Sequence, residues 1–210
     1  PDSVTDLNMY TFSGCVSLES IELPDGITSI GIHMFSNCIS LMSINIPDSV
    51  TSILPAAFSG CTNLTSIEIP YGVTSIGSNS FNNCENLESV KIPNSITSIG
   101  TRAFYNCLKL ENIEIPNGVT LIDICTFQNC KNLETIIIPA SVTEIKESAF
   151  IGCGGLSDVY YYGTAEEWAN ITVSESQNQY LLNATIHYNY TPVILQYIDG
   201  VWCSTTLDGT

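Results

Sequence analysis

A spacing of 23 residues runs through most of this chain of 210 residues and constrains its fold more than any other feature. Four residue types return at that spacing seven times each, without an insertion or a deletion. A fixed period of about 20 to 50 residues indicates stacked repeat units, because a single unit cannot bury its apolar face alone. The recurring positions are proline at 1, 24, 47, 70, 93, 116 and 139, phenylalanine at 12, 35, 58, 81, 104, 127 and 150, cysteine at 15, 38, 61, 84, 107, 130 and 153, and leucine at 18, 41, 64, 87, 110, 133 and 156.

One repeat shows how each unit is expected to fold. Its segment Leu64–Ile69 reads LxxIxI and alternates at its end, which predicts a short strand with one buried face. A proline then ends the strand, because it has no amide hydrogen to donate, and it begins a turn. Val73 and Ile76 are predicted to return to the core along a second extended run. Phe81 and Cys84 lie three positions apart, as on one helical or 3₁₀ turn.

The full pattern, LxxIxIPxxVTxIxxxxFxxCxxL, resembles the BspA-like leucine-rich repeats of bacterial and protozoan surface proteins over roughly residues 1–161. The resemblance implies a repeat solenoid, a curved right-handed superhelix with short parallel strands on its concave face. It also implies an extracellular or cell-surface location and a role in adhesion, including binding to host matrix proteins.

The chain is predicted to divide into three parts. Residues 1–161 form seven coils, and residues 162–190 form a small C-terminal α/β cap. Within the cap, Thr164 followed by Glu167 predicts a short helix with a capping box, and Trp168 and Ile171 are placed to cover the open end of the core. The alternating segment Ala184–Tyr190 predicts a strand. Residues 191–210 are predicted to be a linker or the start of a truncated following module.

Charge excludes two classes of partner. The chain has 21 acidic and 5 basic residues, for a net charge of −16. Such a surface repels phosphate backbones and anionic headgroups, so a nucleic-acid partner is not expected. No stretch approaches the roughly 20 apolar residues of a membrane span, so this segment is not expected to insert into a membrane.

The nine cysteines do not have the clustered spacing of a metal site. The seven in the repeat are interpreted as small buried hydrophobic residues in one column, with a ladder of disulfides as the alternative. The two histidines, His33 and His187, have no sequence partner that suggests a triad or a zinc site. We therefore predict no catalytic residue, no metal and no cofactor.

The outward residues of the predicted strands are the candidate binding site. They form three columns on one continuous sheet surface, which carries eight acids and one base. Three interpretations stay open: a solvated face that keeps the chain soluble, an acidic docking surface for a basic partner, and a site for divalent cations. The candidate residues are Glu19, Glu22, Glu68, Glu88, Lys91, Glu111, Glu114, Glu134, Ile137 and Tyr160.

Ile137 and Tyr160 interrupt the polar columns near the C-terminal end of this face. Together with Tyr161, Tyr162 and Trp168 they form either an exposed aromatic patch, of the kind favoured at binding hot spots, or a set of residues covered by the cap.

The leading functional hypothesis is a non-enzymatic binding module that engages a protein or a glycan through the concave face. A structural spacer that displays a neighbouring domain is the alternative. An enzyme acting on polysaccharide is a distant third, because glycosidases use paired carboxylates whereas acids repeated along a whole face do not form one such pair.

Overall fold

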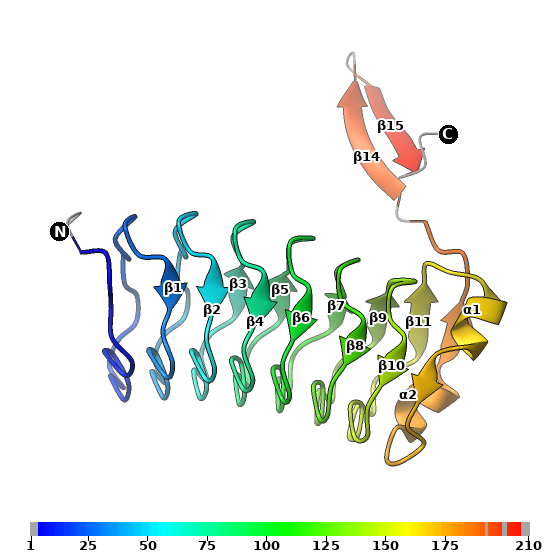
Figure 1. Ribbon diagram of the computed structural model, residues 1–210, viewed down its shortest axis with the longest axis horizontal. Helices are drawn as coiled ribbons and strands as arrows, with labels where there is room; N and C mark the ends of the chain where they lie inside the picture. Colours follow the sequence, from blue (N-terminus) through cyan, green and yellow to red (C-terminus); the bar gives the residue numbers. More distant parts are fainter. Residues whose placement is uncertain (1–3, 192, 199–200, 207–210) are drawn as a thin grey trace.

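The computed structural model describes residues 4–191, 193–198 and 201–206. Most of them form a stack of similar coils that runs from the N-terminal end to two short helices (Figure 1). Neighbouring coils pair through parallel strands whose partners lie 23 residues apart, such as Ser66 with Ser89. The predicted leucine-rich-repeat solenoid is therefore confirmed.

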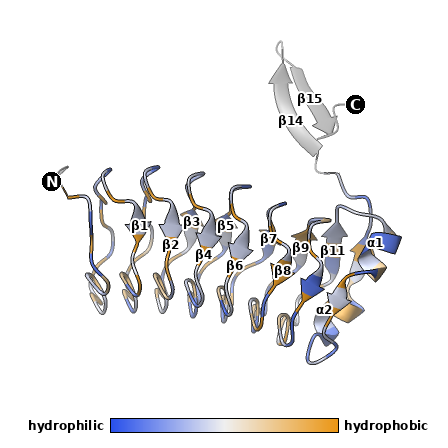
Figure 2. Cartoon of the chain, in the orientation of Figure 1, coloured by the Kyte–Doolittle hydropathy of each residue, from blue (hydrophilic) through white to orange (hydrophobic). Residues whose placement is uncertain are grey.

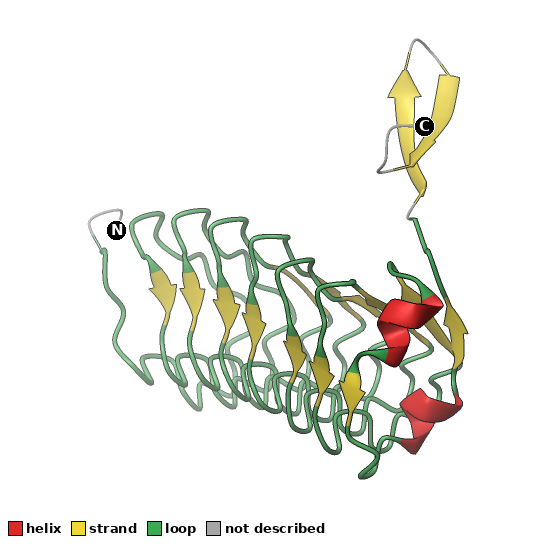
Figure 3. Ribbon diagram, turned by 45° about the vertical axis from the view of Figure 1, so that its right-hand side comes forward, coloured by secondary structure: helices red, strands yellow, loops and turns green. Residues whose placement is uncertain are grey.

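Each full coil contributes to two parallel sheets, which lie on different sides of the stack (Figure 3). The sheet built from the LxxIxI segments is called the major sheet. It begins with a single bridge between Glu22 and Asn45. Its strands are β3 (Ser66–Glu68), β5 (Ser89–Lys91), β7 (Asn112–Glu114), β9 (Thr135–Ile138), β11 (Asp158–Tyr161) and β13 (Thr185–His187).

The second extended run of each repeat forms the other sheet, called the minor sheet. The predicted return of Val73 and Ile76 to the core is confirmed, since both side chains are buried. The strands of the minor sheet are β1 (Ser29–Ile30), β2 (Ser52–Ile53), β4 (Ser75–Ile76), β6 (Ser98–Ile99), β8 (Leu121–Ile122), β10 (Glu144–Ile145) and β12 (Thr172–Val173).

Turns connect the two sheets as the sequence predicts. The amide of Val73 donates to the carbonyl oxygen of Pro70 at 3.0 Å, which closes the turn that begins at the proline. On the far side of the coil, the amide of Cys84 donates to the carbonyl oxygen of Phe81 at 3.2 Å. A bond between residues three apart is the geometry of a 3₁₀ turn.

The core is a set of ladders, one for each recurring apolar position. The phenylalanine rings from Phe12 to Phe150 stack with centroids between 5.3 and 5.6 Å apart, and those from Phe35 onward are fully buried. Burial of one such side chain stabilises the fold by roughly 1.5–3 kcal/mol. Hydrophobic and hydrophilic residues alternate within each coil along the whole stack (Figure 2), so every coil contributes to one continuous core.

Both sheets are interrupted at the same junction. The major sheet has no pairing between β5 and β7, and the minor sheet has none between β6 and β8. Around this junction, the amide of Thr97 bonds to Thr74 at 2.9 Å, and that of Thr143 bonds to Thr120 at 2.9 Å. No corresponding bond joins Thr120 to Thr97, although both lie in the described part of the chain. The sheet ladders therefore stop and restart between these two coils.

The turn side of the same junction stays bonded. The amide of Phe104 donates to the carbonyl oxygen of Thr126 at 3.0 Å, and the rings of Phe104 and Phe127 stack at 5.6 Å. The Cys130 thiol donates to the carbonyl oxygen of Phe104 at 3.1 Å. The two groups of coils are thus held together through the phenylalanine and cysteine side of the stack.

The cap covers the last coil and extends both sheets. Its strand β12 pairs with β10, and its strand β13 pairs with β11. The predicted capping box is present on helix α1 (Ala165–Ala169), where Thr164 accepts from the amide of Glu167. Trp168 packs edge-on against the buried ring of Tyr161 at 5.1 Å, and Ile171 is buried, so the predicted cover over the core is confirmed.

Two elements of the cap were not predicted: strand β12 and helix α2 (Gln179–Asn183). Their position depends on Asn178, a fully buried polar residue. Its side-chain oxygen accepts from the amide of Phe150 at 3.0 Å, and its amide donates to the carbonyl oxygens of Lys146 and Ser174 at 2.8 and 2.7 Å. Asn178 thus satisfies backbone groups of the last coil that have no further repeat to bond to.

An antiparallel hairpin follows the cap, formed by β14 (Val193–Ile198) and β15 (Val201–Thr206). The sequence predicted a linker or the start of a further module for residues 191–210 and did not anticipate a hairpin within them.

Candidate functional site

The outward residues of the major sheet form one exposed surface, called here the strand face. Strand alternation explains it: in β3, Ile67 is buried, whereas Ser66 and Glu68 on either side are exposed. The same alternation places eight of the ten candidate binding residues in the solvent. These exposed residues are Glu19, Glu22, Glu68, Glu88, Lys91, Glu111, Glu114 and Glu134.

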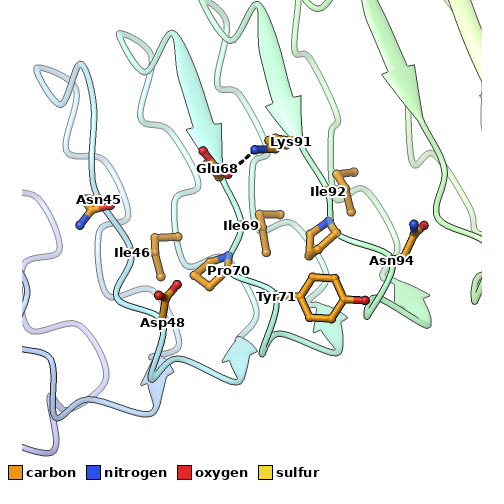
Figure 4. Close-up of a pocket in the computed structure, with 11 residues that line it drawn as sticks. Asn45, Ile46, Asp48, Glu68, Ile69, Pro70, Tyr71, Lys91, Ile92 and Asn94 are labelled. Carbon is orange, nitrogen blue, oxygen red and sulfur yellow. Dashed lines mark hydrogen bonds and ion pairs between the residues drawn. The ribbon is translucent and has the colours of Figure 1, made fainter. Parts of the chain in front are cut away.

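Because the strands are parallel and in register, candidate residues from successive coils are direct neighbours, with strands about 4.8 Å apart. Glu68 lies opposite Lys91, and their side chains form an ion pair at 2.5 Å (Figure 4). Glu114 lies opposite Ile137, and Ile137 lies opposite Tyr160. The register therefore aligns the third predicted column within two groups, Glu68 with Lys91 and Glu114 with Ile137 and Tyr160, on either side of the break between β5 and β7.

Two bases outside the predicted columns also reach this surface. The Nζ atom of Lys109 lies 3.9 Å from Glu88 Oε1, and Lys131 lines a shallow depression together with Glu111 and Glu134. Both lysines precede the strand segments, and strand alternation predicts the exposure only of residues within a strand. Glu19, Glu22, Glu111 and Glu134 form no ion pair with any described residue, so the strand face keeps a surplus of negative charge.

At the C-terminal end, the strand face becomes aromatic. Tyr160 is half-buried and stacks on His187 of β13, with centroids 4.6 Å apart and planes 13° apart. Tyr190 lies 4.8 Å from the Tyr160 ring and stacks in parallel with Tyr162. Residues of the cap strand and the segment after it therefore cover Tyr160 from one side.

Hydrogen bonds tie this aromatic cluster to two carboxylates. The Tyr162 hydroxyl donates to Glu114 at 2.6 Å, and the pKa of Tyr162 is raised, first by burial and then by this bond to a carboxylate. His187 Nε2 lies 2.7 Å from Asp158 Oδ1, and the bonds from His187 and Ser157 lower the pKa of Asp158. The side chain of His187 thus adds one contact between the cap and the last coil.

Tyr161 and Trp168 do not belong to this surface. Strand alternation turns Tyr161 into the core, where it is 1% exposed, and Trp168 packs against it from the side of α1. The four aromatic residues grouped by the sequence are therefore divided, with Tyr160 and Tyr162 on the strand face and Tyr161 and Trp168 at the end of the core.

The described residues contain no group of three or more His, Cys, Asp or Glu side chains arranged to hold a metal ion. The acids of the strand face follow the repeat with at most two per coil, and the coil of Asn45 carries none. In the part of the chain that the structure describes, no helix is long and apolar enough to span a lipid bilayer.

Known proteins share both the repeat and the fold. A family model described as a BspA type leucine-rich repeat region matches residues 1–107 and 51–179, with six copies. The crystal structure of a leucine-rich repeat protein of T. pallidum is 32% identical, with a TM-score of 0.68, and the match covers 73% of this chain and 72% of that one. No curated protein matches the sequence.

Two further solved structures extend the comparison. A leucine-rich repeat protein from Bacteroides ovatus is 30% identical over 77% of this chain and 54% of its own, with a TM-score of 0.62. The pneumococcal vaccine antigen PcpA is 18% identical over 90% of this chain and 40% of its own, with a TM-score of 0.50, which is a likeness of fold alone. The family model spans more than half of the sequence, and the chain belongs to the BspA-type leucine-rich repeat family.

Proposed function

We propose that this chain is a non-enzymatic binding module of a cell-surface or secreted protein, and that it engages a protein or glycan through the strand face. The observation that carries the proposal is the exposure of that face in every coil. Three columns of outward side chains recur every 23 residues, in register within the coils on each side of the break between β5 and β7, and nearly all of them are exposed. A rigid, extended surface of this kind suits recognition of a large partner.

The charge of the face favours a basic protein partner. Four candidate glutamates, Glu19, Glu22, Glu111 and Glu134, have neither an ion pair nor a side-chain hydrogen bond among the described residues, whereas Glu114 accepts from the Tyr162 hydroxyl. Neighbouring coils are closer together than the screening length of about 8 Å at physiological salt, so their fields add. A partner with lysine or arginine at a matching spacing would be attracted along the whole row.

Membership of the family supports the location at a cell surface or outside the cell. The alternative is a spacer that displays a neighbouring domain. A spacer would need the same rigid stack but no ligand on the strand face, so the two functions separate in a binding experiment. An enzyme acting on polysaccharide stays the distant alternative, and it would release reducing sugar from a polysaccharide panel.

The test measures binding of the purified chain to an array of extracellular-matrix proteins and glycans. The variant Glu68→Lys, Glu88→Lys, Glu111→Lys reverses three charges on the strand face. Its matched control is Asp6→Lys, Glu147→Lys, Glu175→Lys, which makes the same change in net charge at exposed positions outside the strand columns.

We expect saturable binding by the wild-type chain, loss of binding in the strand-face variant and retention in the control. Equal binding by all three chains would show that the strand face is not the contact surface. Absence of binding to every member of the array would favour the spacer.

A further inference from the structure

A groove lies beside the strand face, where β3 and β5 end and the proline turns begin. Its volume is about 470 Å³, within the range of about 300–1,000 Å³ typical of small-ligand sites. The last residues of three successive LxxIxI segments, Ile46, Ile69 and Ile92, line it in a row (Figure 4). Ile46 and Ile69 are buried and Ile92 is half-buried, so the floor of the groove is the edge of the core.

Tyr71 stands at this groove without a structural reason to be there. Its side chain is 75% exposed, more than any other large hydrophobic residue of the described chain. The ring extends from the turn after β3 on the side of the next coil (Figure 4). Within the described residues it stacks on no other ring, and its hydroxyl forms no hydrogen bond. The equivalent positions of the other coils carry Asp2, Asp25, Asp48, Asn94, Asn117 and Ala140.

The polar groups around Tyr71 are suited to hydroxyl groups. Asn45, Asp48 and Asn94 also line the groove. A side-chain amide both donates and accepts hydrogen bonds, and a carboxylate accepts two or more. None of these three side chains forms a side-chain hydrogen bond with the rest of the described chain, so their capacity is available to a ligand.

The charges of the groove disfavour anionic ligands, because Asp48 lines it and has no ion-pair partner among the described residues. Glu68 and Lys91 both line it, and they neutralise each other in an ion pair at 2.5 Å. Lys91, the one base among the three outward strand columns, makes this the part of the strand face least suited to a basic segment. Anionic ligands are repelled by a chain with a net charge of −16.

We propose that this groove binds a neutral glycan, with a sugar ring stacked on Tyr71 and its hydroxyl groups bonded to Asn45, Asp48 and Asn94. A sugar ring has an apolar C–H face that packs on an exposed aromatic ring such as that of Tyr71, and a polar rim that needs donors and acceptors. The groove presents both. The groove shares Asn45, Glu68 and Lys91 with the outward strand columns. Glycan binding here rests on Tyr71 and does not require the surplus of negative charge, so either proposal can fail without the other.

The experiment titrates the full chain with neutral hexasaccharides of glucose, mannose, galactose and N-acetylglucosamine, and follows binding by saturation-transfer NMR. Tyr71→Asn is the informative variant. It preserves the coil, because asparagine occupies the equivalent position at Asn94 and Asn117. Tyr180→Asn, which changes an exposed tyrosine of α2 away from the groove, is the matched control.

We expect at least one neutral hexasaccharide to bind, with an affinity about tenfold lower in Tyr71→Asn, as the loss of one aromatic stacking contact implies. Tyr180→Asn should bind within about twofold of wild type, because it leaves Tyr71 unchanged. Tyr71→Phe should do the same, because phenylalanine keeps an aromatic ring at position 71. The proposal is overturned if no neutral hexasaccharide binds or if Tyr71→Asn binds as tightly as wild type. A heparin-derived hexasaccharide or polylysine that displaces the neutral sugar from Tyr71 with higher affinity would also overturn it.

Discussion

The thiol of Cys84 donates a hydrogen bond to the carbonyl oxygen of Phe58, 3.2 Å away and 26 residues earlier in the chain. The same bond recurs in every coil from Cys38 to Cys153, with lengths of 3.0–3.3 Å. Burial raises the pKa of these thiols, to about 12 for Cys61, so each stays protonated and keeps its hydrogen to donate. The cysteines of the described coils are free, and the disulfide ladder considered from the sequence is absent from them.

The hydrogen bond from the Cys84 thiol to the Phe58 carbonyl oxygen can be tested by substitution of Cys84. Replacement by alanine removes the donor, while the Phe58 carbonyl oxygen keeps its bond from the amide of Cys61 at 3.1 Å. The loss of one hydrogen bond should lower the free energy of unfolding by about 0.5–1.5 kcal/mol. Cys84→Ser keeps a donor and should lose less. Cys15→Ala is the control, because Cys15 is exposed and donates no such bond. Denaturant unfolding of the three variants provides the measurement, and an unchanged Cys84→Ala would show that the thiol bond does not stabilise the coil.

A second prediction concerns a left-handed column of the repeat, which holds only glycine and asparagine. Gly60 has φ of +78°, and a Cβ atom there would lie 2.4 Å from the side-chain oxygen of Asn37. Gly14 has φ of +73° with open space around it. Both alanine variants should lose roughly 1–2 kcal/mol to the backbone conformation, and Gly60→Ala should lose more because of the clash.

The double variant Asn37→Gly, Gly60→Ala isolates the cause. Removing the Asn37 side chain should reduce the loss at Gly60 to that of Gly14→Ala in thermal or denaturant unfolding. Equal losses in Gly14→Ala and Gly60→Ala single variants would argue against the clash.

The interruption of both sheets predicts uneven hydrogen exchange. Thr97, Thr120 and Thr143 occupy the same position in three successive coils, but only the amides of Thr97 and Thr143 bond to the preceding coil. The amide of Thr120 should therefore have a lower protection factor than those of Thr97 and Thr143, since an amide without a hydrogen-bond partner exchanges more readily. Residue-resolved exchange by NMR measures this. A protection factor for Thr120 equal to those of Thr97 and Thr143 would mean that the ladder is continuous in solution.

The contact between Asp158 and His187 predicts a dependence on pH. Hydrogen bonds from His187 and Ser157 lower the pKa of Asp158, so the native state favours its ionised form. A carboxyl group with a lowered native pKa contributes stability that is present above its unfolded pKa of about 4 and is lost as pH falls through the native value. Asp158→Asn should therefore reduce stability at about pH 6, and its deficit relative to wild type should shrink at about pH 3.

Asp25→Asn is the control for this prediction, because the Asp25 side chain is exposed and forms no hydrogen bond with the described residues. Unfolding free energies of the three chains at both pH values supply the measurement. If the loss of unfolding free energy in Asp158→Asn were the same at both pH values, ionisation of Asp158 would not contribute to the acid sensitivity of the fold.

Much of the fold follows from the sequence, because the period fixes which residues become neighbours. The strand at Leu64–Ile69, the turn at Pro70 and the stacked phenylalanines all result from alternation and proline chemistry. The interruption between β6 and β8 does not, since the repeat continues through that junction without an insertion or deletion. Helix α2 was not predicted either, because its placement depends on the buried side chain of Asn178 and not on an apolar period.

The candidate site shows the same division. Alternation correctly exposes Glu68 and buries Ile67, but it assigns residues only within a strand. Lys109 and Lys131 reach the strand face from the segments before the strands, and Tyr190 reaches it from the segment after β13. Tyr71 lies in a turn, where strand alternation predicts nothing, and it is the one aromatic residue of a column otherwise made of aspartate, asparagine and Ala140.

We propose that the strand face binds its partner through its surplus of negative charge. The most direct test takes the matrix protein that binds most tightly in the array and measures its affinity from about 50 to 500 mM salt, a range over which screening between exposed charges becomes strong. The neutralised variant Glu68→Gln, Glu88→Gln, Glu111→Gln is compared with wild type. We predict that wild-type affinity falls steeply with salt and that the variant is weaker and falls less. Identical salt dependence of the two chains would contradict the account.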